Sequence, residues 1–258
     1  MICKICKNKS NKIFTKKVFG KYDISYYKCL NCEFIQTEDP FWLEDAYSNP
    51  INISDTGLLK RNIFLSKITA LIIILYFNRK KIFVDFAGGY GVFVRLMRDI
   101  GFNFFWSDLF TENIFSKGFE WDKKKEKKVE MITTFESFEH FEDPLKEVQK
   151  MLDISDNILF STEIIPSKNI EEWWYLGVHH GQHISFYSEK TLKIISDKFD
   201  LRLYTNNKNI HLFTRSNKKV NFKLVTFLSK IRIGLIIFKI MHSKTIEDSD
   251  KVRTQDFL

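Results

Sequence analysis

Residues 82–93 constrain the fold of this chain more than any other stretch. They read Ile-Phe-Val-Asp-Phe-Ala-Gly-Gly-Tyr-Gly-Val-Phe, so an apolar, β-type run carries the acid Asp85 and leads into a glycine-rich turn, and a helical pattern follows. This order predicts a strand, a tight nucleotide-binding turn and a helix. A second acid, Asp108, follows the apolar run 102–106 and is placed to meet a ribose at the end of the next strand. We therefore expect a nucleoside-containing cofactor.

The spacing of the glycines distinguishes two kinds of cofactor. A dinucleotide fingerprint has three glycines, G-x-G-x-x-G, and here Gly89 and Gly91 fit the first two positions but Val94 occupies the third. This departure disfavours a pyrophosphate, and with it a nicotinamide oxidoreductase. S-adenosylmethionine has no phosphate, and its carboxylate can bind free backbone N–H groups at a helix N-terminus. An acid before the glycines suits its amino group.

The stretch resembles motif I of class I S-adenosylmethionine-dependent methyltransferases, usually D-x-G-x-G-x-G. Alanine replaces the first glycine of that motif, which we expect to be tolerated if its φ is negative. The carboxylate after the second strand matches the ribose-binding acid of that family. The resemblance thus implies a cofactor site made of Asp85, Ala87, Gly88, Gly89, Gly91, Asp108 and Glu136.

The resemblance continues downstream and covers roughly residues 80–215. An E-H pair, Glu139-His140, precedes D-P at 143–144, as is common after the fourth strand of this superfamily. Residues 145–152 have helical apolar spacing, and 158–165 read as a buried strand. The implied fold class is α/β, a Rossmann-like methyltransferase sheet with helices on both faces.

All four cysteines lie near the N-terminus, in two C-x-x-C pairs: Cys3 with Cys6, and Cys29 with Cys32. This spacing predicts a zinc ribbon. Four protein thiolates leave no position for water, so the zinc should be structural. Disulfides and a catalytic zinc are the alternatives. The alternation within 12–28 predicts short antiparallel strands.

A zinc module ahead of a methyltransferase domain resembles enzymes that methylate sugars, notably nucleotide-linked sugars, in polysaccharide biosynthesis. We expect a zinc-ribbon module at 1–42, the methyltransferase domain at 43–216 and a basic helical tail at 217–258. The expected acceptor is a small molecule or a glycan-linked sugar hydroxyl.

Residues 171–188 combine adjacent tryptophans with three of the six histidines of the chain. Aromatic faces stack on sugar rings or bases, and amide and imidazole groups supply directional hydrogen bonds. Ligands of open α/β sheets bind beyond the carboxyl ends of the strands. The predicted acceptor-binding residues are Trp173, Trp174, Tyr175, Gln182 and Tyr187. Buried packing is the alternative for the tryptophans.

A hydroxyl acceptor must lose a proton during methyl transfer, and imidazole is suited to accept it. His183 is the first candidate for this base and His140 the second. Each has a structural alternative: His183 could hold its loop through the backbone, and His140 could end the fourth strand. His179 and His180 could ligate a metal together with His183, although no nearby carboxylate pattern completes that set. Ser188 is expected to cap the following helix.

The net charge of +8 is concentrated at the two ends, with +4 in residues 1–40 and +5 in 217–258. The middle is therefore near neutral, which disfavours a nucleic-acid partner. An RNA methyltransferase and a non-catalytic cofactor-binding protein remain as alternatives. No secretory signal leads the chain, so a cytoplasmic location is expected. The oligomeric state is left open.

Three apolar or polar stretches complete the sequence-based expectations. The apolar run 68–77 is too short to span a bilayer and predicts a covering helix. Residues 218–241 read as one or two basic amphipathic helices, which pack on the body, dock on a partner or lie on a membrane surface. Residues 246–258 are polar, and we expect them to fray or to lie along the surface.

Overall fold

The computed structural model describes residues 1–48, 55–125, 127–230 and 241–255. The strands in chain order are β1 Ser10–Val18, β2 Tyr22–Cys29, β3 Ile35–Thr37, β4 Ile82–Phe86, β5 Asn103–Ser107, β6 Met131–Thr134, β7 Asn157–Ser161, β8 Ser185–Phe186, β9 Arg202–Thr205 and β10 Ile210–Thr214. The α-helices are α1 Leu43–Ala46, α2 Leu58–Tyr76, α3 Val92–Ile100, α4 Pro144–Leu152, α5 Glu189–Lys198, α6 Phe222–Lys230 and α8 Thr245–Gln255. Three short 3₁₀ turns are η1 Phe138–His140, η2 Ile170–Glu172 and η3 Trp174–Leu176.

The described strands form two sheets. The larger has the order β5-β4-β6-β7-β10-β9, with β4 parallel to β5 and β6, and with β9 antiparallel to β10. The smaller has the order β1-β2-β3-β8. The strand–turn–helix expected at 82–93 is confirmed as β4 followed by α3. The expected strand at 158–165 is shorter, because the ladder ends at Ser161.

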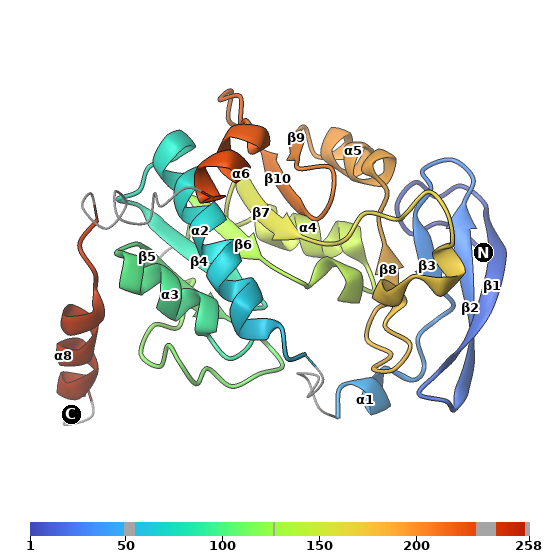
Figure 1. Ribbon diagram of the computed structural model, residues 1–258, viewed down its shortest axis with the longest axis horizontal. Helices are drawn as coiled ribbons and strands as arrows, with labels where there is room; N and C mark the ends of the chain where they lie inside the picture. Colours follow the sequence, from blue (N-terminus) through green and yellow to red (C-terminus); the bar gives the residue numbers. More distant parts are fainter. Residues whose placement is uncertain (49–54, 126, 231–240, 256–258) are drawn as a thin grey trace. The chain divides into compact units, whose positions relative to one another are not determined.

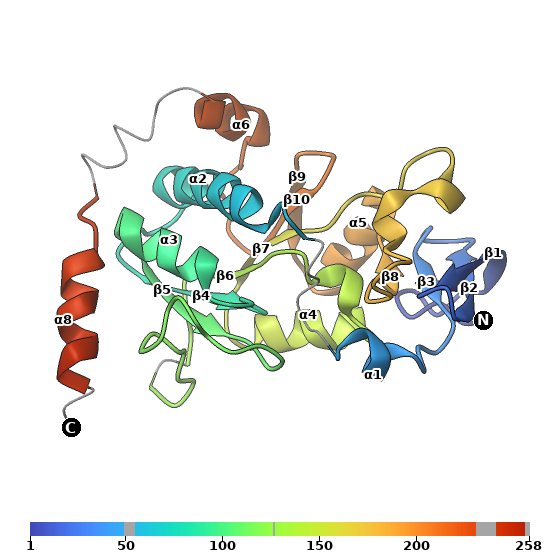
Figure 2. The same ribbon diagram turned by 60° about the horizontal axis from the view of Figure 1, so that its bottom comes forward.

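The chain folds as two compact units. The first comprises Met1–Asn52, Phe135–Asp153 and Phe160–Arg215, and the second comprises Ile53–Thr134, Ile154–Leu159 and Ser216–Leu258. In the second unit, α2 packs against α3 and α6 (Figures 1 and 2). The run 68–77 lies on α2, where Ile68 and the residues from Ala70 to Ile73 are buried, so the expected covering helix is confirmed.

The first unit contains the four-stranded sheet. The expected antiparallel strands at 12–28 are confirmed as β1 and β2. The last strand of this sheet, β8, comes from a distant part of the chain and pairs with β3, where Ile35 lies opposite Phe186. The Trp42 indole N–H also donates to the Gly181 carbonyl, 2.8 Å away. The N-terminal segment therefore does not complete its own sheet, and the domain boundaries expected at 42 and 216 stay predictions.

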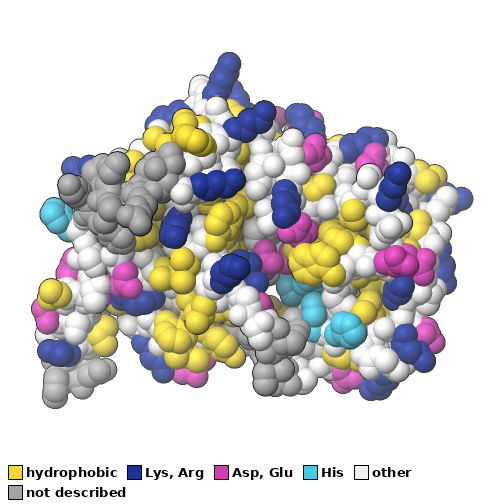
Figure 3. All heavy atoms as spheres, viewed as in Figure 1, with side chains coloured by type: hydrophobic (Ala, Val, Ile, Leu, Met, Phe, Trp, Pro, Cys, Tyr) yellow, Lys and Arg dark blue, Asp and Glu magenta, His cyan; other side chains and the backbone are white. Residues whose placement is uncertain are grey.

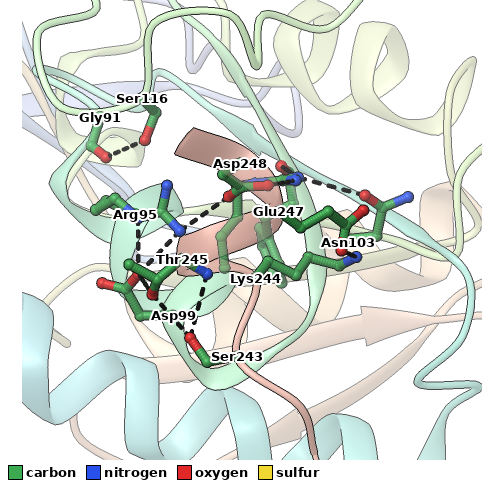
Figure 4. A network of polar contacts seen from close by, with 12 residues as sticks. Gly91, Arg95, Asp99, Asn103, Ser116, Ser243, Lys244, Thr245, Glu247 and Asp248 are labelled. Carbon is green, nitrogen blue, oxygen red and sulfur yellow. Dashed lines mark hydrogen bonds and ion pairs between the residues drawn. The ribbon is translucent and has the colours of Figure 1, made fainter. Parts of the chain in front are cut away.

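Of the two alternatives for the polar C-terminal stretch, fraying and lying along the surface, the first does not hold for Thr245–Gln255. These residues form α8, and the Asp248 carboxylate is only 3% exposed. It accepts hydrogen bonds from the Arg98 guanidinium at 2.5 and 2.7 Å and from Arg95 at 2.9 Å (Figure 4). A buried charge needs a partner, so this carboxylate ties α8 to α3.

The basic tail is described only in part. Residues 222–230 form α6, as expected, whereas 231–240 lie outside the described residues. None of the described helices is both long and apolar enough to cross a bilayer.

Candidate functional site

The turn between β4 and α3 is built around a buried acid. Asp85 is buried near the end of β4, and its Oδ1 accepts a hydrogen bond from the Thr133 hydroxyl on β6 at 2.6 Å. Gly88 follows, and a Cβ there would lie 2.8 Å from Asp85 Oδ2 and 3.0 Å from Cδ1 of Trp106. The backbone therefore passes so close to both side chains that only glycine fits this position.

Asp108 lies directly after β5 and faces this turn, as expected. Its Oδ2 accepts from the Gly89 N–H at 2.9 Å, and its Oδ1 accepts from the N–H groups of Phe110 at 2.7 Å and Thr111 at 3.0 Å. The Gly89 carbonyl in turn accepts from the Trp106 indole and the Thr111 hydroxyl. The second acid and the glycine turn thus form one network.

The N–H groups of the turn are not free in the way the sequence indicated. Those of Gly88, Gly89 and Gly91 donate to the Ser107 carbonyl, the Asp108 carboxylate and the Gly88 carbonyl. Asp108 thus places a negative charge beside the turn. The sequence does not show which backbone groups a neighbouring loop will satisfy, and the predicted part of these residues in cofactor binding stays a prediction.

The condition under which alanine was expected to be tolerated at position 87, a negative φ, is not met. The φ of Ala87 is +56°, in the left-handed region, and Gly89 and Gly91 in the same turn are at +53° and +82°. The turn keeps the backbone path that a glycine would adopt, although its first residue carries a Cβ. A non-glycine residue in this region costs about 1–2 kcal/mol.

Replacing Ala87 with glycine is therefore expected to stabilise the protein. The Ala87→Gly variant should unfold with a free energy about 1 kcal/mol higher, because the strain of the left-handed alanine is removed. Urea denaturation of both proteins measures the difference. An equal or lower free energy of unfolding would contradict the strain.

Burial raises the pKa of Asp85 from 3.8 to about 7; the nearby charge of Asp108 raises it further, and the Thr133 hydrogen bond lowers it. Between those two pH values the folded chain holds a proton that the unfolded chain has released. Asp85 therefore makes the folded state less stable as the pH rises from 3.8 towards about 7.

The Asp85→Asn variant should lose this pH dependence. Asparagine retains an oxygen that can accept from Thr133 but cannot ionise, so at pH 8 the variant should be about 1–3 kcal/mol more stable than the parent. At pH 4 the two should be nearly equal. Urea unfolding at both pH values measures this, and an unchanged difference between the two proteins across the pH range would contradict it.

Glu136 belongs to the other unit. Its φ is +52°, its N–H donates to Ser161 Oγ at 2.8 Å, and its carboxylate accepts from the same hydroxyl at 2.5 Å. The left-handed backbone and the side chain are thus held by a single serine. Its predicted part in cofactor binding stays a prediction.

The four cysteines converge in the first unit. All four are free thiols, and their Sγ atoms lie within 4.8 Å of one another, with Cys3 to Cys32 and Cys6 to Cys29 both at 3.4 Å. The edge of a tetrahedral ZnS₄ site is about 3.8 Å for Zn–S bonds of about 2.3 Å. The arrangement fits a four-coordinate zinc and contains no disulfide.

The two C-x-x-C turns share one backbone geometry. The residues after them, Lys7 and Glu33, have φ of +61° and +65°, and their N–H groups donate to the Cys3 and Cys29 carbonyls. The N–H of Cys32 also points at Cys29 Sγ, 3.5 Å away. Two equivalent turns presenting sulfur pairs to one point are what a zinc ribbon requires.

The two candidate bases lie together. The rings of His140 and His183 meet edge to face at 5.0 Å. His183 Nδ1 is 2.6 Å from the Tyr175 carbonyl, and His140 Nδ1 is 3.0 Å from the Tyr47 hydroxyl. Burial lowers the pKa of His140 to about 3 and that of His183 well below its usual value. Both rings are therefore neutral at pH 7, and neither is a strong base in this state. The structural alternative for His183, a bond to the backbone, is present.

A buried carboxylate lies beside these rings. Burial, followed by the charge of Glu136, raises the pKa of Glu139 to about 8, while the hydroxyls of Tyr175 and Thr162 lower it. The sequence indicated Glu139 only as part of the E-H motif. The alternative in which His140 ends the fourth strand does not hold, because β6 ends at Thr134 and His140 lies in η1.

The predicted acceptor-binding residues fall into two groups. Trp174 is 74% exposed and Trp173 is half-buried. Tyr175, Gln182 and Tyr187 are buried; the Gln182 amide donates to the Ala46 carbonyl, and the Tyr187 hydroxyl donates to the Phe138 carbonyl. The hydrogen bonds of this second group hold the fold, so Trp174 is the aromatic side chain of the set most open to a ligand. Ser188 caps α5 with Thr191 in a capping box, as expected.

A family model described as a methyltransferase domain matches residues 61–206, more than half of the chain. The chain belongs to the methyltransferase domain family. The expected class of enzyme, an S-adenosylmethionine-dependent methyltransferase with a Rossmann-like α/β fold, is thereby confirmed.

Several solved methyltransferases resemble the fold at low sequence identity. CalO1, a methyltransferase of calicheamicin biosynthesis solved with S-adenosylhomocysteine, has 13% identity and a TM-score of 0.43; the match covers 67% of this chain and 61% of that one. The magnesium protoporphyrin IX methyltransferase of Synechocystis PCC 6803 has 9% identity and a TM-score of 0.43, covering 68% and 95%. A possible histamine N-methyltransferase of Thermotoga maritima has 12% identity and a TM-score of 0.47, covering 68% and 100%. No curated protein matches the sequence.

Proposed function

We propose that this methyltransferase transfers the methyl group of S-adenosylmethionine to a hydroxyl of a small-molecule or glycan-linked acceptor, a sugar hydroxyl in the first instance. The observation that carries the proposal is the network of the β4–α3 turn, in which Asp85 lies beneath the glycines and Asp108 lies beside them. Asp108 Oδ2 accepts one described hydrogen bond, from the Gly89 N–H, and so keeps a lone pair that suits a ribose hydroxyl.

The acceptor side of the proposal rests on the first unit. Trp174 offers an exposed aromatic face, and a sugar ring can stack on such a face. The four-cysteine site supports the likeness to sugar methyltransferases that the sequence indicated, and we propose that it binds one structural zinc ion. With four protein ligands it would hold the fold and leave no position for a substrate.

Loss of the Asp108 carboxylate should weaken binding of the cofactor. The Asp108→Ala variant is expected to bind S-adenosylhomocysteine about 1–3 kcal/mol more weakly, or about 5–150-fold, because polar groups lose their charged partner. Isothermal titration calorimetry with the zinc-loaded full chain measures this. Glu112→Ala is the matched control, since Glu112 is an exposed carboxylate of the same loop that pairs only with Lys117 among its described ion pairs.

The acceptor is tested separately, by incubating the protein with nucleotide sugars and methyl-labelled cofactor. Labelled sugar product supports the proposal. Calorimetric binding of the cofactor without transfer to any sugar would instead support the non-catalytic alternative, and no cofactor binding at all would overturn the assignment of the turn.

A further inference from the structure

A second cluster of ligand-type side chains lies in the first unit, apart from the cysteines. Glu139, His140 and His183 each bring one donor atom within 4.8 Å of the others. The first two are neighbours in η1, and the third lies just before β8, so the fold joins them across more than forty residues. The metal-site alternative in the sequence instead grouped His183 with its two neighbouring histidines, and that set had no nearby carboxylate. Here the carboxylate comes from Glu139.

Glu139 supplies an independent sign that the cluster binds a cation. Its side chain is 0% exposed; the Tyr175 and Thr162 hydroxyls are near enough to lower its pKa, but neither carboxylate oxygen has a partner among the described residues at hydrogen-bond geometry. Leaving a buried carboxylate without a partner costs several kcal/mol, whether it stays charged or takes up a proton. A cation bound at this point would remove that cost.

The two rings are oriented as metal-ligating histidines usually are. A carbonyl oxygen can only accept, so His183 Nδ1, 2.6 Å from the Tyr175 carbonyl, carries the proton. The lone pair of the neutral ring is then on Nε2. His140 Nδ1 lies 3.0 Å from the Tyr47 hydroxyl, which can either donate or accept, so this contact holds the ring without fixing its tautomer. Contacts of this kind orient histidine rings around a bound metal.

We propose that Glu139, His140 and His183 bind one divalent first-row transition-metal ion, in addition to the zinc of the four cysteines. One carboxylate and two imidazoles suit Zn²⁺, Mn²⁺, Fe²⁺ and Co²⁺, and three protein ligands leave a position open for water or a ligand oxygen. Both histidines are half-buried, and histidine side chains reach the surface in Figure 3. If the proposed function holds, the open position would take an acceptor oxygen; the metal site itself does not depend on that.

The test uses the full chain loaded with a single equivalent of zinc, so that only the cysteine site is filled; it is titrated with Mn²⁺, and electron paramagnetic resonance measures the free ion. Carboxylate ligands suit Mn²⁺ and thiolates do not, so the cysteine site keeps its zinc. One Mn²⁺ should bind per chain. Glu139→Gln and His183→Gln should each weaken Mn²⁺ binding by more than about 100-fold. Losing only a residue that hydrogen-bonds a metal ligand weakens metal binding by at most about 100-fold, so a larger loss indicates a direct ligand. His179→Asn, at an exposed neighbouring histidine, should bind as the parent does.

Three results would overturn the proposal. They are no Mn²⁺ bound by the parent protein, unchanged binding in Glu139→Gln and His183→Gln, and equal loss in the His179→Asn control. Zinc content and melting temperature report whether each variant is folded. If both ligand variants fail to fold, the stoichiometry of the parent protein decides alone. None of these measurements depends on cofactor binding, so a failure of the metal-site proposal can be told apart from a failure of the proposed function.

Discussion

Replacing Cys32 with serine is expected to abolish zinc binding and to unfold the sheet β1-β2-β3-β8. Binding of a structural zinc contributes about 10–16 kcal/mol of apparent free energy to such modules, so losing one of four thiolates removes a large part of their stability. Cys32 is buried, and its carbonyl accepts from the hydroxyls of Ser188 at 3.2 Å and Thr191 at 2.8 Å, at the start of α5. Disorder should therefore spread from the cysteines to β8 and α5.

Metal analysis and hydrogen exchange measure the two effects. The parent chain should hold one zinc more than Cys32→Ser, and amides of β1 and β2 should exchange much faster in the variant. Leu30→Ser is the matched control, because Leu30 is exposed on the same C-x-x-C turn and its side chain is not a ligand. A variant that kept its zinc and its protected amides, or disulfides in the purified parent, would contradict the structural-zinc proposal.

The second large effect is expected at Asp248. Arg98 is buried, its guanidinium lies 3.7 Å from the centre of the Phe119 ring, and Asp248 is the one acid among its described ion pairs. Asp248→Ala should cost about 3–5 kcal/mol, the range for removing one partner of a buried ion pair. Release of α8 and hydration of Arg98 would limit this cost.

Hydrogen exchange of α8 together with urea denaturation measures the loss. Asp250→Ala on the same helix is the control, since that side chain is exposed. The double variant Arg98→Met with Asp248→Leu should lose less stability than Asp248→Ala, because no unpaired charge is left buried. Equal stability of Asp248→Ala and Asp250→Ala would contradict a stabilising role for this ion pair.

The local patterns in the sequence predicted the elements that surround the site. The turn after β4, the acid after β5, the two cysteine pairs and the cap at Ser188 each depend on residues close together in the chain, where spacing and backbone preference act directly. The left-handed φ of Ala87 could not be predicted in this way. Propensity alone favours a negative φ for alanine, and the path of the whole turn, with Gly89 and Gly91 also at positive φ, is not written in that residue type.

The end of the chain illustrates the same limit. Residues 246–258 look polar enough to fray, and no short-range pattern shows that Asp248 will meet Arg98, which lies 150 positions earlier. The ion pair stabilises a helix whose own sequence has no apolar face to bury. Likewise, the local sequence around Tyr175 and Tyr187 does not show that both side chains are buried; their predicted part in acceptor binding stays a prediction.

The sequence by itself determined the methyltransferase family, the strand–turn–helix that carries the candidate cofactor site, and the four cysteines of the candidate zinc site. These features are encoded in residue type and short spacing. Only the tertiary structure decided which backbone donors Asp108 occupies, that β8 completes the N-terminal sheet, and that Glu139 meets His140 and His183. Such juxtapositions arise from chain segments that are far apart in sequence, and they are set by burial and hydrogen bonding across the whole unit rather than by any local pattern.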